Sequence, residues 1–467
     1  MVISSECRVL MGPLGFARYA FVLIMISLTV PSLMGQVFEA SDYNSGTSNT
    51  YGIQEAIDAA SAAGGGTVEI GPGAFTLNPR NGTAAILIRP HVRLVGSGVD
   101  KTILKLTNGS KQPVSLIANA NYRNPDAAAP DRDMTLEAFT LDANAEGQVV
   151  GKTVLQSNIS GLGLEEALVK SPTAVKYLSV LCVDPGPNQE IVTAAQITQG
   201  GFKGYFFRPH SAGAQVLVLV YRLYAIALIG AQDVTVRGMR IRNVPLDGVY
   251  ISNTVSLGTT ANYYWYHQYE TYSQRIVVQN TEFLRCYRNG VSVVNGSDIH
   301  IVGNTFRFIT GAPGAAVDVE PDRVEAHASN IEIRDNVIED CYFGIMLALH
   351  NNGPTSENSW GQEVVGNVIR RVKVGCGILL SENRAAPTVT SNEIHEAAWG
   401  GIVIVGTTGA RVVQNVVYAL RNCRTGIWVV DGSMPSVDNY IACNKVFLLD
   451  PISGSSSPCG SDPLCGF

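Results

Sequence analysis

Charged side chains are scarce in this chain of 467 residues. They account for 15% of the sequence, compared with about 25% in an average soluble domain. Acidic residues outnumber basic ones, and the formal net charge is -6 with a pI near 5.7. No run of lysine and arginine occurs, so the chain lacks the positive surface that phosphate backbones require, and we expect no nucleic-acid partner.

Long apolar runs are missing after residue 35. Near the start, Arg8 and Arg18 precede an apolar stretch over 19–30, and small residues follow up to Gly35. This order is typical of a secretory signal peptide, which we expect over 1–35. The stretch is too short to span a bilayer, so the sequence predicts an exported protein, extracellular or periplasmic, without a stable membrane anchor.

Cysteine spacing of the kind that binds zinc is absent as well, and we predict no metal site and no cofactor from these residues. Eight of the nine cysteines lie outside the predicted signal, and an exported chain can oxidise them. Their positions allow a Cys459–Cys465 pair in the C-terminal tail and a Cys423–Cys443 pair. Three further cysteines lie just before repeat motifs and are interpreted as buried thiols: Cys286, Cys341 and Cys376.

What the sequence has in abundance is a repeat. Seven segments after residue 270, such as IHIVGNTF and IEIRDNVI, share two alternating apolar positions, a short spacer, an asparagine and another apolar position. Stacked asparagines can satisfy one another's amides from coil to coil, so we interpret them as a structural ladder. They recur at intervals of 23 to 32 residues: Asn280, Asn304, Asn336, Asn367, Asn392, Asn415 and Asn444.

A second motif lies between these asparagines, a small residue followed by alternating apolar positions. Two or three short strands per unit of roughly 25 residues make one coil of a parallel β-helix. The sequence therefore predicts an all-β fold, a single-stranded right-handed parallel β-helix. The small residues are Gly248, Gly290, Ala316, Gly344, Gly377, Gly401 and Gly426.

We expect one solenoid domain over 36–467, with a tail over 451–467. An N-terminal cap is predicted over 36–77, because an amphipathic helix there can cover the open apolar end of a solenoid. Its apolar face contains Ile53, Ala56, Ile57 and Ala60. The stretch 145–231 keeps no clean period and is interpreted as an insertion.

The front of the predicted domain carries a family resemblance. The helix, the strand GGGTVEI, the turn GPGAF and the segment RLVGSGVDKTIL from Arg93 resemble the start of the pectate lyase superfamily domain. That grouping includes rhamnogalacturonase-like and epimerase-like β-helix proteins, and the close part of the resemblance covers about Val37 to Leu106. It implies the fold and a polysaccharide partner, and it leaves the reaction open.

Chemistry on such a solenoid must come from outward side chains on adjacent coils. In the two columns of outward positions that follow the small residues, acidic residues occur in one coil only, where Asp318 and Glu320 are expected to face solvent together. Strand geometry places them roughly 6.5–7 Å apart, compatible with the paired acids of inverting glycosidases. We predict that they are the catalytic pair, with Asp247 and Asp322 as substitutes; a polar edge or a calcium site is the alternative. The first outward column is Tyr250, Ser292, Asp318, Met346, Leu379, Val403 and Trp428.

Residues around this pair are predicted to bind the polysaccharide. They are polar side chains near the strand ends, together with aromatic residues of the segment NYYWYHQYETY, whose rings suit sugar faces. The predicted substrate-binding residues are Tyr250, Asn295, His350, Glu382, Arg384, Trp265 and Tyr264.

The sequence motifs support the prediction of the reaction less strongly than that of the fold. The segment Asp318-Val-Glu320-Pro321-Asp322 only loosely approaches the D-P-H-E of alginate epimerases. No Lys or Arg stands in the outward columns to stabilise a carbanion, which favours hydrolysis of a pectin-like or other uronic-acid glycan. A lyase or C5-epimerase, and a non-catalytic glycan-binding surface protein, are the alternatives. The sequence leaves the oligomeric state open.

Overall fold

The computed structural model describes most of the chain after the predicted signal peptide. The signal, Asp322, His350, Tyr264, Trp265, Cys423 and the Cys459–Cys465 pair lie outside the described residues. The described ranges are 35–78, 83–109, 115–124, 129–219, 223–253, 273–311, 314–321, 326, 328–349, 359–420 and 426–449.

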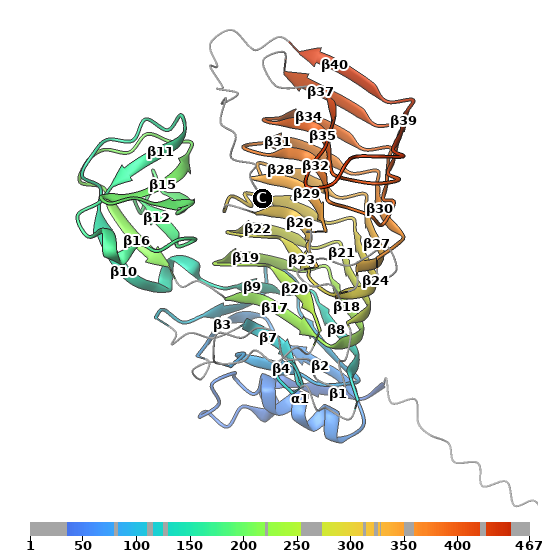
Figure 1. Ribbon diagram of the computed structural model, residues 1–467. Coiled ribbons are helices and arrows are strands. Elements are labelled where there is room, and N and C mark those ends of the chain that lie inside the picture. Colours follow the sequence, from blue (N-terminus) through green and yellow to red (C-terminus); the bar gives the residue numbers. More distant parts are fainter. Residues whose placement is uncertain are drawn as a thin grey trace, which may run out of the picture.

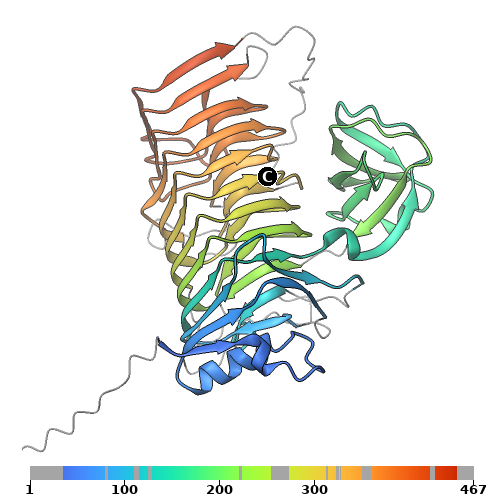
Figure 2. The same ribbon diagram turned by 180° about the vertical axis from the view of Figure 1, so that it is seen from behind.

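Three long parallel sheets wind through the described residues as a solenoid (Figure 1, Figure 2). Each coil contributes one strand to each sheet in turn, and every strand pairs in parallel with its counterpart in the next coil. The predicted right-handed parallel β-helix is confirmed.

The strands of each sheet are given in their stacking order. The twelve-stranded sheet contains β1 (Val37–Glu39), β2 (Gly66–Ile70), β5 (Val92–Gly96), β8 (Asp131–Glu137), β18 (Ala231–Arg237), β21 (Gln274–Gln279), β24 (Gly296–Val302), β27 (Ala328–Arg334), β30 (Gln362–Val365), β33 (Thr388–Thr390), β36 (Arg411–Val413) and β39 (Tyr440–Ala442). The eleven-stranded sheet contains β3 (Gly73–Leu77), β6 (Thr102–Leu106), β9 (Thr140–Asp142), β19 (Arg240–Val244), β22 (Glu282–Cys286), β25 (Thr305–Arg307), β28 (Val337–Glu339), β31 (Val368–Val372), β34 (Glu393–Ala397), β37 (Val416–Leu420) and β40 (Lys445–Leu449). The ten-stranded sheet contains β4 (Ile86–Ile88), β7 (Ser115–Asn119), β17 (Tyr224–Ile229), β20 (Val249–Ser252), β23 (Val291–Val293), β26 (Ala315–Val319), β29 (Phe343–Ala348), β32 (Cys376–Ser381), β35 (Gly400–Val405) and β38 (Ile427–Val430).

The core runs along the inside of the solenoid as columns of branched aliphatic side chains. Ile276, Ile299 and Ile331 are register partners on successive coils, and each is at most 1% exposed. Because alternate residues of a strand point to opposite faces, each inward residue packs on its counterpart in the coils above and below. Burial of this continuous apolar column is what holds the coils together.

The N-terminal end of the core is covered by helix α1 (Ile53–Ala62), preceded by the short 3-10 helix η2 (Ala40–Tyr43). Its predicted apolar face is confirmed, since Ile53, Ala56, Ile57 and Ala60 are fully buried. The Thr50 hydroxyl accepts a hydrogen bond from the backbone N–H of Gln54 and helps to satisfy the first turn. The amphipathic spacing thus directs one face of the helix onto the open end of the solenoid.

The asparagine ladder is confirmed from Asn304 to Asn444 and corrected at Asn280. In each pair, the side-chain oxygen of one asparagine accepts bonds from the backbone N–H and side-chain amide of the previous one, at 2.9–3.0 Å. Thr281, not Asn280, is the register partner of Asn304. Asn280 instead lies one residue earlier at φ 50°, the left-handed position that Gly303 fills in the next coil at φ 65°.

Replacing Asn367 by alanine is expected to destabilise the solenoid by about 2–4 kcal/mol, because the buried amide groups of Asn336 and Asn392 would each lose a hydrogen bond. Asn280→Gly is the matched control. It lies outside the ladder, its conformation suits glycine, and we expect a change within about 0.5 kcal/mol. Denaturant unfolding midpoints test this, and equal losses in the two variants would contradict the ladder's role.

The insertion folds as two small antiparallel sheets around a core of its own, which includes Phe202, Phe206 and Val216. It leaves the solenoid after β9 and the 3-10 helix η3 (Ala145–Gly147), and it includes the 3-10 helix η4 (Pro172–Ala174). One sheet contains β10 (Val149–Val154), β16 (Gln215–Leu219), β12 (Val180–Val183) and β13 (Glu190–Thr193), and the other contains β11 (Gly163–Leu168), β15 (Gly201–Phe206) and β14 (Gln196–Ile197).

The expected end of the insertion at residue 231 is wrong. The strand β17 already belongs to the ten-stranded sheet, where it pairs with β7 and β20. Five successive residues of this strand, 225–229, are buried, so the sequence shows none of the alternation by which a coil strand is recognised.

The prediction that three cysteines are buried thiols is confirmed. Cys286, Cys341 and Cys376 are buried and free, and burial raises the pKa of the Cys341 thiol to about 12. Cys443 is an exposed free thiol, and Cys423, its expected disulfide partner, lies outside the described residues. Over the residues that the structure describes, no helix is long and apolar enough to cross a membrane.

Candidate active site

The outward face of the ten-stranded sheet carries the predicted column of side chains in the predicted register. Backbone pairing joins Tyr250 to Ser292, Ser292 to Asp318 and Asp318 to Met346. The column then continues through Leu379 and Val403 to Trp428. The small residue that begins each strand is thus a reliable marker of register.

Asp318, in β26, is the acidic residue of this column. The prediction that it faces open solvent is wrong. Asp318 is only 6% exposed, and its Oδ1 atom has no hydrogen-bond partner. Burial, followed by the nearby negative charge of Glu320, raises the pKa of Asp318 well above its ordinary value, although Arg288 acts in the opposite direction. The side chain therefore holds its proton to higher pH than an exposed aspartate does, and one of its buried oxygens has no hydrogen-bond partner.

Asn289 connects Asp318 to the rest of the site. Its side-chain amide donates to Asp318 Oδ2 at 2.9 Å and to the Ser292 hydroxyl at 2.8 Å. Its side-chain oxygen accepts from the backbone N–H of Ala315 at 2.8 Å, and its own backbone N–H donates to Asp247 Oδ1 at 3.1 Å. This buried residue fixes the two carboxyl groups relative to each other.

Asp247, proposed as a substitute acid, is engaged in an ion pair. Its carboxylate accepts two bonds from the Arg288 guanidinium, at 2.7 and 2.5 Å, and is fully buried. The Arg288 side chain remains 29% exposed. Burial alone would lower the pKa of Arg288, but the carboxylate of Asp247 raises it well above the ordinary value. Arg288 is therefore a permanent cation, unsuited to be a base.

An aromatic pair adjoins this polar group. The rings of Tyr224 and Tyr250 stack with centroids 4.5 Å apart, on adjacent strands β17 and β20. Tyr250 was predicted from its column, whereas Tyr224 was missed because its strand lies in the range interpreted as insertion. Both tyrosines lie on the same sheet as Asp318. The strand of Tyr250 is two strands from that of Asp318, which corresponds to about 9.6 Å between the two backbones.

The other predicted binding residues follow the ends of nearby strands of this sheet or lie outside the described chain. Asn295 is buried just after β23. Glu382 accepts a bond from the backbone N–H of Ser433, and the guanidinium of Arg384 lies against the Met434 sulfur. These two residues follow β32, two strands beyond Asp318, and are held by the loop after β38.

The insertion is anchored beside the site, which the sequence did not indicate. Tyr287, the residue before Arg288, is 2% exposed and packs against Cys182, Leu217 and other insertion residues. Its hydroxyl donates to Glu146 Oε1 at 3.2 Å, and that same oxygen accepts from the Gln189 side-chain amide. The insertion thus fixes the turn that carries Arg288 and Asn289.

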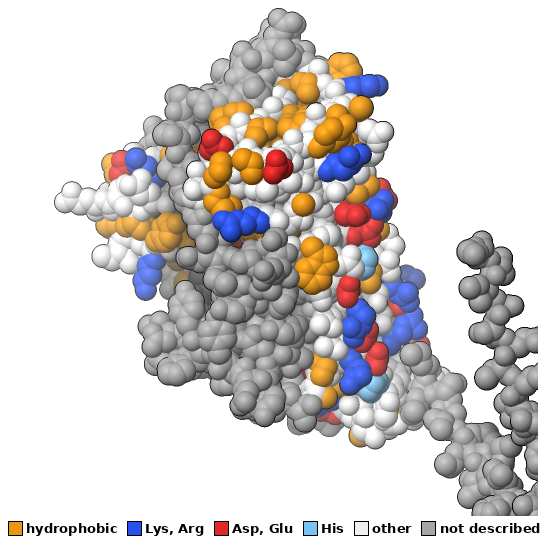
Figure 3. Space-filling model, turned by 45° about the vertical axis from the view of Figure 1, so that its right-hand side comes forward, with side chains coloured by type: hydrophobic (Ala, Val, Ile, Leu, Met, Phe, Trp, Pro, Cys, Tyr) orange, Lys and Arg blue, Asp and Glu red, His pale blue; other side chains and the backbone are white. Residues whose placement is uncertain are grey.

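A second side of the solenoid carries many more charged side chains (Figure 3). Figure 3 shows Lys, Arg, Asp and Glu side chains gathered in a band along one side. On the twelve-stranded sheet these charges pair between coils, as where Arg93 and Arg237 both bond Glu137. Within the described part of the chain, no group of three or more His, Cys, Asp or Glu side chains is arranged to hold a metal.

Known proteins resemble the chain at the level of the fold and over short stretches of sequence. The family of the right handed beta helix region matches residues 220–360 and 321–446. In structure, a tailspike protein mutant of E. coli bacteriophage HK620, solved with a pentasaccharide, superimposes with a TM-score of 0.53 and 12% identity, over 90% of this chain and 64% of that one. The chain is a right-handed parallel β-helix protein.

Curated relatives match shorter parts. Mannuronan C5-epimerase AlgE3 of Azotobacter vinelandii is 33% identical over 121 residues, 25% of this chain and 6% of that protein. Alginate lyase 7 of the same organism is 33% identical over 111 residues, 22% of this chain and 12% of that protein. The chain therefore spans only a small fraction of the relatives it matches.

Proposed function

We propose that this protein is a carbohydrate-active enzyme that removes the proton on C5 of a uronic-acid sugar, as a polysaccharide lyase or C5-epimerase. The observation that carries the proposal is the buried Asp318, whose Oδ1 atom has no hydrogen-bond partner and whose pKa is raised, beside the Arg288 cation. The names of the curated relatives favour this chemistry over the glycoside hydrolysis expected from sequence. The predicted signal peptide implies that the activity is exerted outside the cytoplasm.

The site supplies what proton removal beside a carboxylate requires. A protonated Asp318 can donate a hydrogen bond from its unpartnered oxygen to the sugar carboxylate, and Arg288 can supply positive charge. Both effects stabilise the negative charge that develops when the C5 proton leaves. The absence of cations from the outward column, which favoured hydrolysis, is offset because Arg288 reaches the site from the preceding turn.

The phenol of Tyr250 is the group we assign to proton transfer. It lies in the same column as Asp318, and Tyr224 stacks on its ring and limits its movement. Tyrosine can act as a general base or acid when a neighbouring charge favours the required form. In a lyase the leaving sugar oxygen is then protonated, and in an epimerase a different proton, of solvent origin, is delivered to the opposite face of C5.

The reaction is tested by incubating the protein with polymannuronate, polygalacturonate and a neutral glucan in deuterated water. We expect either deuterium at C5 of a uronate polymer, as epimerisation gives, or elimination, which leaves C5 without a hydrogen. New reducing ends with the ultraviolet absorbance of unsaturated uronate would indicate a lyase, and deuterium without new ends would indicate an epimerase. Reducing ends without that absorbance and without deuterium would mean hydrolysis and would contradict the proposal.

A further inference from the structure

The insertion stands along one edge of the ten-stranded sheet, next to the candidate active site. It contacts the solenoid at Tyr287, and again two coils further on, where the ring of Tyr205 meets Tyr342 edge-on at 5.5 Å. Tyr342 directly precedes β29, the strand that pairs with the strand of Asp318. The insertion is therefore positioned to act as a side wall for a polymer that lies on this sheet.

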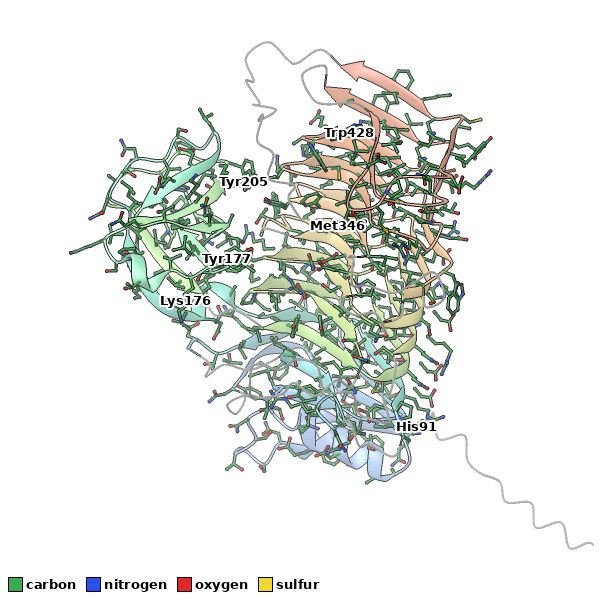
Figure 4. The ribbon with its side chains drawn as sticks, viewed as in Figure 1. His91, Lys176, Tyr177, Tyr205, Met346 and Trp428 are labelled. Carbon is green, nitrogen blue, oxygen red and sulfur yellow. The ribbon has the colours of Figure 1, made fainter. Side chains whose placement is uncertain are left out.

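One turn of the insertion displays an aromatic ring and a cation together. Tyr177 is 65% exposed, and the adjacent Lys176 is also exposed. Over the described residues, neither side chain takes part in an ion pair or ring contact. In Figure 4, Tyr177 and Tyr205 both lie at the margin of the insertion that is nearer the solenoid.

This turn is fixed in place. The backbone N–H of Lys176 donates to the Ser179 hydroxyl, and the Ser179 N–H donates back to the Lys176 carbonyl, both at 2.9 Å. Between them Leu178 adopts φ 61°, a left-handed conformation that is costly for a leucine. The turn therefore holds the backbone at Lys176 and Tyr177 in one conformation, which reduces the entropy lost when a ligand binds.

We propose that Lys176 and Tyr177 form a subsite for a uronic-acid sugar of the polymer whose reacting unit lies at Asp318. The tyrosine ring offers an apolar face to the sugar ring, and the lysine ammonium pairs with the sugar carboxylate. The charge balance of the insertion suits this ligand. It has five Lys and Arg against four Asp and Glu over 149–219, in a chain of net charge -6. The inference rests on the proposed function for the class of polymer.

Binding is measured by calorimetry in an Asp318→Asn background, where we expect turnover to be greatly slowed, with hexamers of mannuronate, galacturonate and neutral glucose as probes. We expect Tyr177→Ala to weaken uronate binding about five- to tenfold, and Lys176→Gln about two- to threefold, with the lysine effect vanishing at high salt. The matched control is Tyr440→Ala. Tyr440 is another exposed tyrosine beside a cation, Arg411, but it lies on the twelve-stranded sheet.

The outcomes separate this inference from the proposed function. Uronate binding and turnover by the parent, with no difference between Tyr177→Ala and Tyr440→Ala, would overturn the subsite and leave the reaction intact. A higher KM for uronate polymer in Tyr177→Ala, in the otherwise native protein, would support it. If the parent neither binds nor turns over any uronate oligomer or polymer, both the subsite and the proposed function are wrong.

Discussion

Replacing Asp318 by asparagine is expected to reduce turnover of a uronate polymer about a thousandfold while the solenoid stays folded. Asparagine keeps the size of the side chain and can still accept the bond from Asn289 at the Oδ2 position. Its amide N–H, at the Oδ1 position, is a far weaker acid than a carboxyl group and stabilises the charge that develops on the sugar carboxylate less well. Initial rates on the polymer that the parent turns over are the measurement.

The control for this variant is Asp335→Asn. Asp335 has φ 54°, a conformation that asparagine also tolerates, and it lies on the turn before the ladder residue Asn336, away from the ten-stranded sheet. We expect it to retain parental turnover. Comparable rates for Asp318→Asn and the parent would show that Asp318 does not take part in the reaction.

The raised pKa of Asp318 also predicts a pH dependence of stability. The unfolded chain loses this proton near pH 4, whereas the folded chain keeps it to higher pH, so the folded state binds more protons in between. The parent therefore loses stability as pH rises from about 4 to the folded pKa. Asp318→Asn lacks this loss.

Thermal unfolding of the two proteins across pH measures the effect. We expect similar melting temperatures below about pH 4 and a growing advantage for Asp318→Asn as pH rises. In the parent, activity that needs the protonated acid should fall as pH rises through the same pKa. A variant that is less stable than the parent at neutral pH and not at low pH would show that the pKa is lowered instead.

Removing the charge of Asp247 by substitution with asparagine is expected to lower kcat/KM about a hundredfold and to destabilise the fold by about 2 kcal/mol. The carboxylate is fully buried and holds the Arg288 guanidinium through two bonds and the Asn289 backbone through a third. Without it, Arg288 loses its fixed position, and Asn289 loses one of the contacts that orient it toward Asp318.

A second substitution separates the loss of stability caused by an unpaired Arg288 charge from the loss of activity caused by the missing Arg288 cation. Arg288→Gln combined with Asp247→Asn should recover part of the stability, because no unpaired charge remains, but kcat/KM should stay low. The matched control is Asp233→Asn, which breaks a surface pair with Arg275 whose side chains are 33% and 47% exposed. We expect that change to cost less than about 1 kcal/mol and to leave kcat/KM unaltered. Full activity in the double variant would mean that the Arg288 cation is dispensable.

The sequence by itself determined the coils and the register of the outward column. Alternation of apolar residues and the recurring small residue are local features, and each coil repeats them, so the partners of Asp318 on adjacent strands were predictable. The same reasoning failed at Asn280, because a one-residue shift in the turn moves the ladder position to Thr281. It also failed at β17, where burial of both faces removes the alternation.

Only the tertiary structure decided the chemistry of the site. The burial of Asp318, the link through Asn289 and the reach of Arg288 from the preceding turn depend on contacts between coils and turns that have no period in the sequence. The insertion likewise contacts Tyr287 through a core that forms only when its own strands fold. Repetition fixes which residues share a face, whereas the pKa and partners of a side chain depend on neighbours that repetition does not specify.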